Sequence, residues 1–220
     1  MNTLDGPRLA PASGGRATSL VVLLHGYGAD GRDLIELGRQ WAPFFPDTAF
    51  VAPHAPEPCD MAPGMRQWFP LNLRDPHEYR LGAAGAAPLL AAFLDAELER
   101  TGLPAGRMAL VGFSQGTMMA LQVGLRRKEP LAGIVGFSGR LAGVDAIADE
   151  AWSRPPVLLV HGDLDEVIPI GALHETANAL ASAGIPVEWH VRPGLGHAID
   201  GEGLALGAAF LHRVLAAPTI

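Results

Sequence analysis

The segment that decides the fold is Gly112-Phe113-Ser114-Gln115-Gly116, a G-x-S-x-G pattern between a strand-like run and a helix-like run. A serine in a sharp turn between a strand and a helix is the arrangement of a nucleophile elbow. Glycine is required on either side of the serine, because side chains there would collide with neighbouring backbone. The segment therefore predicts an exposed Ser114 hydroxyl at the head of a helix. The N–H of Gln115 is expected to face the oxyanion that forms when this hydroxyl attacks an acyl carbon.

A serine hydroxyl is a weak nucleophile at neutral pH, so this interpretation requires a base and an acid further along the chain. In this class of hydrolase the acid and then the histidine follow the serine, each on a loop after a later strand. The strand-like run 156–160 opens into a loop with Asp163 and Asp165, and a later run opens into a glycine-rich loop with His197. Open α/β sheets carry their chemistry at the carboxyl ends of the strands, where we expect these side chains to meet Ser114.

Two aspartates compete for the role of the acid. We predict Asp165, because Asp163 directly follows a glycine at the strand exit, where short acidic side chains commonly accept hydrogen bonds from turn N–H groups. His197 is the predicted base, since neighbouring glycines leave its loop free to bring the imidazole over the serine. His25 and His161 each precede a glycine at a strand end. They are expected to brace loops by hydrogen bonding.

The oxyanion hole needs a second N–H, which usually comes from the loop after an early strand. Strand-like residues 19–24 precede the loop 25–31, HGYGADG, whose glycines allow backbone to approach a ligand closely. We predict that the N–H of Tyr27 pairs with that of Gln115, and that Asp30 caps the helix that follows. The Tyr27 side chain is either a pocket wall or a loop tyrosine packed on the surface.

Strand-like and helix-like segments alternate along the chain, which predicts an α/β fold with a doubly wound, mostly parallel sheet. The chain has 220 residues and a hydrophobic content of 49%. This is enough for residues 1–220 to form a single domain whose sheet is covered on both faces. Residues 1–18 are expected to form a loose arm or a short antiparallel edge strand. The predicted strands are 20–24, 48–52, 107–111, 132–137, 156–160 and 187–191, and the predicted helices are 31–42, 85–101, 115–127, 170–183 and 201–216.

The stretch 53–82 interrupts this alternation, being rich in proline and without a convincing long element. Segments of this length are usually functional or disordered, and the apolar side chains here argue against disorder. We predict a flap that lines the substrate pocket with Trp68, Phe69 and Leu71; the alternative is plain packing of the loop on the sheet edge. No other insertion is large enough for the helical lid of a lipase, so the site is expected to be shallow and open.

Composition narrows the class of protein. The formal net charge of −7, without a Lys/Arg cluster, disfavours nucleic acid as a partner. The lone cysteine, Cys59, excludes an intrachain disulfide and fits a reducing compartment. No signal-peptide pattern and no apolar run of membrane-spanning length is apparent, so we expect a cytoplasmic protein without stable membrane association. The histidines are scattered, and no metal or organic cofactor is expected.

Several motifs in order resemble the phospholipase/carboxylesterase family of α/β-hydrolases, which includes acyl-protein thioesterases and small bacterial carboxylesterases. The resemblance implies the α/β-hydrolase fold, a Ser114, Asp165 and His197 triad, an oxyanion hole at Tyr27 and Gln115, and hydrolysis of carboxylic or thio esters. The matching stretches are 24–31 (LHGYGADG), 67–69 (QWF), 112–116 (GFSQG), 138–139 (SG), 161–165 (HGDLD) and 194–197 (GLGH).

The sequence thus predicts a serine carboxylesterase that acts on a small-molecule ester through an acyl-enzyme, with short to medium acyl chains preferred. An acyl-protein thioesterase or lysophospholipase acting on long acyl chains is the alternative, and a non-catalytic binding module is a more distant one. A dinucleotide-dependent oxidoreductase is disfavoured, because the first strand does not lead into a G-x-G-x-x-G turn. The sequence is also compatible with a homodimer.

Overall fold

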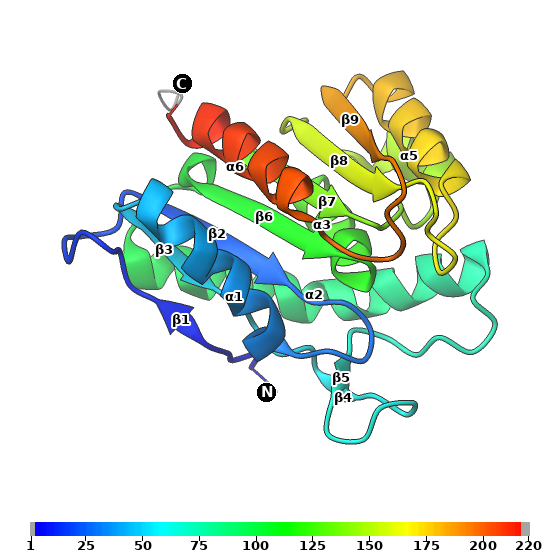
Figure 1. The fold of residues 1–220 in the computed structure, drawn as a ribbon, viewed down its shortest axis with the longest axis horizontal. Helices are drawn as coiled ribbons and strands as arrows, with labels where there is room; N and C mark the ends of the chain where they lie inside the picture. Colours follow the sequence, from blue (N-terminus) through cyan, green and yellow to red (C-terminus); the bar gives the residue numbers. More distant parts are fainter. Residues whose placement is uncertain (1–2, 217–220) are drawn as a thin grey trace.

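A seven-stranded sheet forms the centre of the molecule in the computed structural model, which describes residues 3–216 (Figure 1). Six strands are parallel and β1 is antiparallel, which confirms the predicted α/β sheet and the short edge strand near the start of the chain. In spatial order the strands are β1 (Arg8–Leu9), β3 (Thr48–Val51), β2 (Ser19–Leu24), β6 (Met108–Phe113), β7 (Gly133–Phe137), β8 (Val157–Gly162) and β9 (Val187–Arg192).

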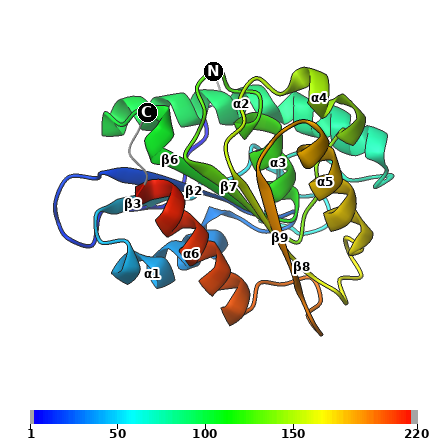
Figure 2. The same ribbon diagram turned by 90° about the horizontal axis from the view of Figure 1, so that it is seen from above.

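Helices cover both faces of this sheet, as Figure 2 shows. One face carries α1 (Gly31–Trp41) and α6 (Gly201–Ala216); the other carries α2 (Pro76–Thr101), α3 (Gln115–Gly124), α4 (Ile147–Glu150) and α5 (Gly171–Ser182). Single 3₁₀ turns stand at Ala42–Phe44, Ala105–Arg107 and Val144–Ala146 (η1 to η3). Successive residues of β2 alternate between the two hydrophobic cores, as a strand covered on both sides requires.

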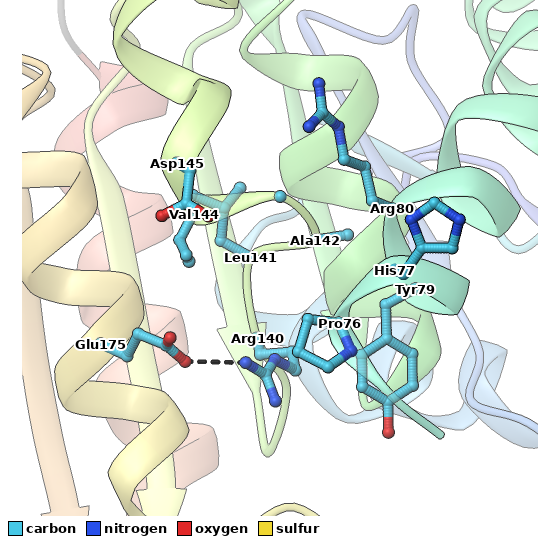
Figure 3. Close-up of a pocket in the computed structure, with 11 residues that line it drawn as sticks. Pro76, His77, Tyr79, Arg80, Arg140, Leu141, Ala142, Val144, Asp145 and Glu175 are labelled. Carbon is cyan, nitrogen blue, oxygen red and sulfur yellow. Dashed lines mark hydrogen bonds and ion pairs between the residues drawn. The ribbon is translucent and has the colours of Figure 1, made fainter. Parts of the chain in front are cut away.

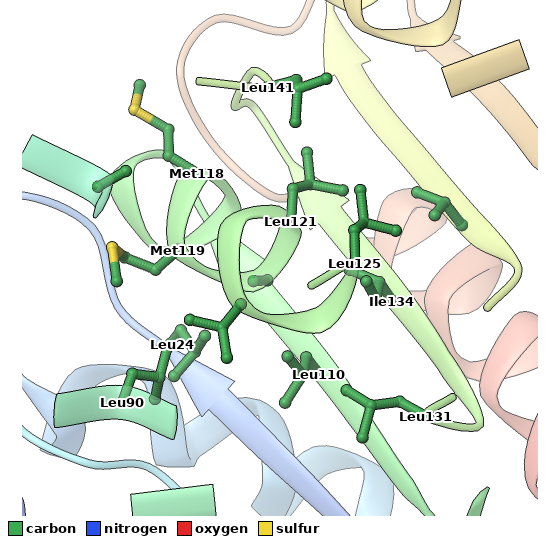
Figure 4. Close-up of a cluster of buried hydrophobic side chains, with 14 of the residues drawn as sticks. Leu24, Leu90, Leu110, Met118, Met119, Leu121, Leu125, Leu131, Ile134 and Leu141 are labelled. Atoms are coloured by element: carbon green, nitrogen blue, oxygen red, sulfur yellow. The ribbon is translucent and has the colours of Figure 1, made fainter. Parts of the chain in front are cut away.

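Helix α3 lies at the centre of the larger core and is buried along its whole length. Figure 4 shows its Leu121 and its methionines packed among Leu24 and Leu110 of the strands and Leu90 of α2. A helix without a solvated polar face is stable when neighbouring elements enclose it in this way. Because the predicted nucleophile Ser114 directly precedes α3, this packing fixes the position of the elbow.

Helix α2 corrects one sequence prediction, since it begins at Pro76 and not at residue 85. Its N-terminus has strong local signals: the Asp75 side chain accepts the N–H of Glu78, and proline occupies the first helical position. A glycine- and alanine-rich stretch in the first turns hides the apolar period that marks a helix. The flap is therefore shorter than the predicted 53–82, and it contains an unpredicted hairpin, β4 (Glu57–Pro58) and β5 (Arg66–Gln67).

By length and composition alone α2 could cross a membrane. In this molecule it packs against α3, and Glu97 near its end is buried between two arginines. Arg8 of β1 and Arg100 of α2 each lie within hydrogen-bonding distance of that carboxylate, at 2.7 and 2.6 Å. Although burial raises the pKa of Glu97, the two guanidinium groups hold it below its ordinary value. These contacts show that α2 packs against the other elements of the folded domain.

The fully buried imidazole of His25 braces two loops at the carboxyl edge of the sheet, as predicted. Its Nε2 accepts the N–H of Ala55 at 2.9 Å, so the proton of the neutral ring is on Nδ1, which donates to the Gly26 carbonyl at 2.8 Å. The ring thus ties the loop after β2 to the segment after β3. Burial lowers the pKa of His25 from 6.5 to about 4.

We expect this histidine to make the protein acid-sensitive. Between pH 6.5 and about 4 the unfolded chain binds a proton at His25 that the folded protein does not, so stability falls as the pH falls through this window. The difference between the two pKa values corresponds to about 3 kcal/mol. Urea unfolding at pH 7 and at pH 4.5 measures the loss, which His25→Asn should reduce. His190→Asn, at an exposed position, is the control. Equal pH dependence in the wild type and His25→Asn would contradict the assignment.

Candidate active site

Ser114 occupies a strained turn between β6 and α3, with φ of +54° and ψ of −116°. Its N–H donates to the Phe137 carbonyl at 2.9 Å, which holds the turn against the neighbouring strand. A Cβ on Gly116 would lie 1.8 Å from the Leu24 carbonyl oxygen, and one on Gly112 would lie 2.4 Å from the backbone of Gly116. Both positions exclude any side chain, as the elbow interpretation requires. A left-handed φ at a serine is the kind of strain found at functional sites.

The carboxylate of Asp165, on the loop after β8, is buried and surrounded by donors. Its Oδ1 accepts the N–H groups of Val167 and Ile168, both at 2.9 Å. Its Oδ2 lies 2.8 Å from Nδ1 of His197. Burial raises the pKa of Asp165, but the Ile168 and Val167 N–H groups and the His197 ring together hold it below its ordinary value of 3.8. Asp165 is therefore a carboxylate at neutral pH and can orient the imidazole.

Two neighbours brace the loop that holds this acid. His161 Nε2 lies 2.7 Å from the Ile168 carbonyl oxygen and 3.3 Å from Oδ2 of Asp165, so it carries a proton directed at both. Burial lowers the pKa of His161, which keeps its ring neutral, and the predicted bracing role is confirmed. Asp163 accepts the N–H of Gly194 at 2.7 Å. This bond to a turn amide is the role predicted for Asp163, and it ties the acid loop to the histidine loop.

His197 lies beside the elbow. Its ring packs against Phe113, the residue before Ser114, with ring centroids 4.9 Å apart. The Ser138 hydroxyl donates to the carbonyl of Ala198, the residue that follows His197, at 3.5 Å. Because Nδ1 faces Asp165, Nε2 is the ring nitrogen left to accept a proton from a neighbouring hydroxyl. The structure thus brings Asp165 and His197 into contact next to the strained serine.

The backbone around Tyr27 lies close to the serine on the other side of the elbow. A Cβ on Gly26 would lie 3.3 Å from Cβ of Ser114. Gln115 is the first residue of α3, where an N–H has no partner inside the helix. Within residues 3–216 no backbone hydrogen bond engages the N–H of Tyr27 or of Gln115, so both are free to face a ligand. Asp30 caps α1, as predicted.

The flap side chains lie differently from the prediction. Trp68 and Phe69 are only 1% and 2% exposed and belong to the main hydrophobic core. Leu71 packs partly buried against the same core. The burial of Trp68 and Phe69 argues against direct contact with a substrate and supports the alternative, packing of this segment onto the domain. Apolar residues in a loop have the same sequence pattern in either case.

A cavity of about 320 Å³ between α2, α5 and the segment after β7 was not foreseen from the sequence (Figure 3). Arg140 lines it between Glu175 and Tyr79, with Nη2 2.7 Å from Oε2 of Glu175 and its guanidinium 5.4 Å from the centre of the Tyr79 ring. The neighbouring Gly139 packs against the first turn of α3, where a Cβ would lie 2.3 Å from Cβ of Thr117. None of the residues that line the cavity belongs to α3, to the predicted triad or to the predicted oxyanion hole.

Within residues 3–216, no group of three or more His, Cys, Asp or Glu side chains is arranged to hold a metal ion.

Comparisons with known proteins point to one family. A family model described as Phospholipase/Carboxylesterase matches residues 10–215. The chain is 32% identical over 194 residues to Esterase YpfH of Escherichia coli (strain K12), covering 86% of this chain and 79% of that protein. It is 29% identical to Acyl-protein thioesterase 1 of Gibberella zeae, with 95% of each chain covered.

Among solved structures, esterase PE8 superposes with a TM-score of 0.94 and 48% sequence identity, covering 97% of this chain and all of that one. Arabidopsis thaliana SOBER1, at 23% identity and a TM-score of 0.78, shares the fold. The family match over nearly the whole chain and the agreement with esterase PE8 lead to one conclusion. The chain belongs to the phospholipase/carboxylesterase family of α/β-hydrolases.

Proposed function

We propose that this ester hydrolase is a serine carboxylesterase that cleaves esters of short to medium acyl chains through an acyl-enzyme. One observation carries the proposal: the hydrogen bond between Asp165 and His197 stands next to a serine held in a strained elbow. A buried, ionised carboxylate on one imidazole nitrogen leaves the other as a base, which is what a serine nucleophile requires.

In the proposed mechanism, Nε2 of His197 takes the proton of the Ser114 hydroxyl as its oxygen attacks the ester carbonyl carbon. Asp165 holds the imidazole in the required tautomer and stabilises its charge. The N–H groups of Tyr27 and Gln115 receive the negative charge on the carbonyl oxygen. The bond to the alcohol then breaks, and the alcohol leaves with the proton from His197. Water, activated by the same imidazole, attacks the acyl-enzyme and releases the acid.

The connections between the strands support a preference for small substrates. Within residues 3–216 they contain no insertion large enough to roof a long acyl channel. The lining of the cavity at Arg140 includes neither the proposed triad nor the proposed oxyanion donors, so this preference does not depend on that cavity.

A thioesterase acting on long acyl chains is the competing function. The match to an acyl-protein thioesterase over 95% of the chain favours it. The two activities share a mechanism, so the catalytic residues do not distinguish them.

We further propose a cytoplasmic location, which the single, buried Cys59 supports.

Replacement of Ser114 by alanine is the direct test of the serine mechanism. We expect kcat/KM for butyryl ester hydrolysis to fall by roughly 10⁴ or more, because the members of a triad act as a unit. Circular dichroism and thermal unfolding provide the control, since the Ser114→Ala substitution should leave the fold intact. Near-wild-type turnover by the folded variant would rule out the mechanism.

Asp165→Asn and Asp163→Asn form a matched pair. We expect Asp165→Asn to lower kcat by roughly 10³ to 10⁴, since an amide does not hold the imidazole in the productive tautomer. Asp163→Asn keeps an oxygen acceptor for the Gly194 N–H and should lower kcat by less than about tenfold. If the two losses were reversed, Asp163 would be the acid.

An acyl-length series distinguishes the two substrate classes. We expect kcat/KM to rise from acetyl to butyryl esters, with about 0.8 kcal/mol gained for each buried methylene, and then to level off or fall. The measurement compares acetyl, butyryl, octanoyl and palmitoyl groups, each as an oxygen ester and as a thioester. A continued rise to palmitoyl would favour the long-chain thioesterase or lysophospholipase.

A further inference from the structure

Trp68 joins the two segments that carry the proposed oxyanion donors. Its backbone N–H donates to Oε1 of Gln115 at 2.9 Å, and its indole Nε1–H donates to the carbonyl of His25 at 2.9 Å. Gln115 supplies one proposed oxyanion N–H from its own backbone, and His25 lies two residues before Tyr27, which supplies the other. One buried residue therefore spans both sides of the hole.

On the helix side, the amide of Gln115 is 1% exposed and makes two bonds to the flap. Besides accepting from Trp68, it donates Nε2–H to the Phe69 carbonyl at 2.8 Å. Both ends of the amide are satisfied, so its orientation is fixed. The same residue thus binds the flap with its side chain and leaves its backbone N–H free for the oxyanion.

On the loop side, the flap strand β5 continues this connection. The Arg66 carbonyl accepts the N–H of Gly28 at 3.0 Å, and the Arg66 N–H donates to the Ala29 carbonyl at 2.9 Å. The rings of His25 and Trp68 are in contact, with centroids 5.6 Å apart. Residues 66–69 therefore bind the oxyanion loop at one end and the start of α3 at the other.

We propose that Trp68 is a positioning residue that sets the separation of the Tyr27 and Gln115 N–H groups; this role rests on the proposed function. An oxyanion hole is effective when both donors lie about 2.7–3.1 Å from the developing charge. The donors here come from separate segments, the loop after β2 and the N-terminus of α3. A misplacement of about 1 Å is enough to lower a rate by about 100-fold. The indole N–H is the group through which Trp68 holds the loop side.

Trp68→Phe tests this role, because phenylalanine keeps an aromatic ring in the core and lacks the indole N–H. Trp41→Phe is the matched control. Trp41 is also buried and donates its indole N–H to a carbonyl, that of Leu204 at 3.3 Å, but between α1 and α6 on the other face of the sheet. Both variants should lose similar thermal stability.

We expect Trp68→Phe to lower kcat for a butyryl ester by about 10- to 100-fold and to change KM by less than about threefold. Its affinity for an alkyl boronic acid, whose tetrahedral serine adduct places an oxygen in the hole, should fall by a comparable factor. Trp41→Phe should keep both values within about twofold of the wild type. Gln115→Met, which removes the side-chain bonds and keeps the backbone N–H, should behave like Trp68→Phe and serves if that variant does not fold.

Wild-type kcat and boronate affinity in folded Trp68→Phe would overturn the positioning role. So would an equal loss of kcat in Trp41→Phe, since the effect would then follow from stability alone. Ser114→Ala, assayed in parallel, separates the two proposals. An inactive Ser114→Ala with an unaffected Trp68→Phe removes only the role of Trp68, whereas an active Ser114→Ala removes the serine mechanism and this role with it.

Discussion

The close approach of two backbones at Gly116 is the constraint on which the site depends. The first turn of α3 passes so near the end of β2 that only a hydrogen atom fits between Gly116 and the Leu24 carbonyl. This contact brings the loop that follows β2 beside the serine. A larger side chain would separate α3 from β2, and the two proposed oxyanion donors would no longer face the same point. Because α3 is buried along its whole length, packing against its neighbours holds it in this position.

A second set of contacts orients the base from the opposite side. The Asp165 carboxylate is held by two backbone N–H groups, so its direction does not depend on His197 alone. The loop after β9 also touches the end of β8 and the loop that follows it: a Cβ on Gly162 would lie 2.1 Å from the Leu195 carbonyl oxygen, which accepts the N–H of Leu164 at 3.0 Å. These loops are thus fixed to one another before any substrate binds, which lowers the reorganisation needed during a reaction.

The parts of the site that could be predicted from the sequence are those governed by local sterics and chain order. Glycines around Ser114, and an acid and a histidine that follow it after successive strands, have few alternative explanations. The place of Trp68 could not be predicted, because an aromatic residue in a loop is equally compatible with a pocket wall and with a core. The start of α2 at Pro76 was hidden by glycine and alanine. The cavity at Arg140 depends on three segments distant in sequence, and no local pattern reports such a meeting.

The two edges of the sheet differ in what covers them, and this bears on pairing between the sheets of different molecules. At one edge the two-residue antiparallel strand β1 covers β3, and the ion pair between Arg8 and Glu97 links β1 to α2. The other edge, β9, lacks such a cover within the described chain, but Glu188 and Arg192 place charges along it. Charged side chains on an edge strand disfavour pairing with a strand of another molecule. Each edge thus carries a feature that disfavours edge-to-edge pairing.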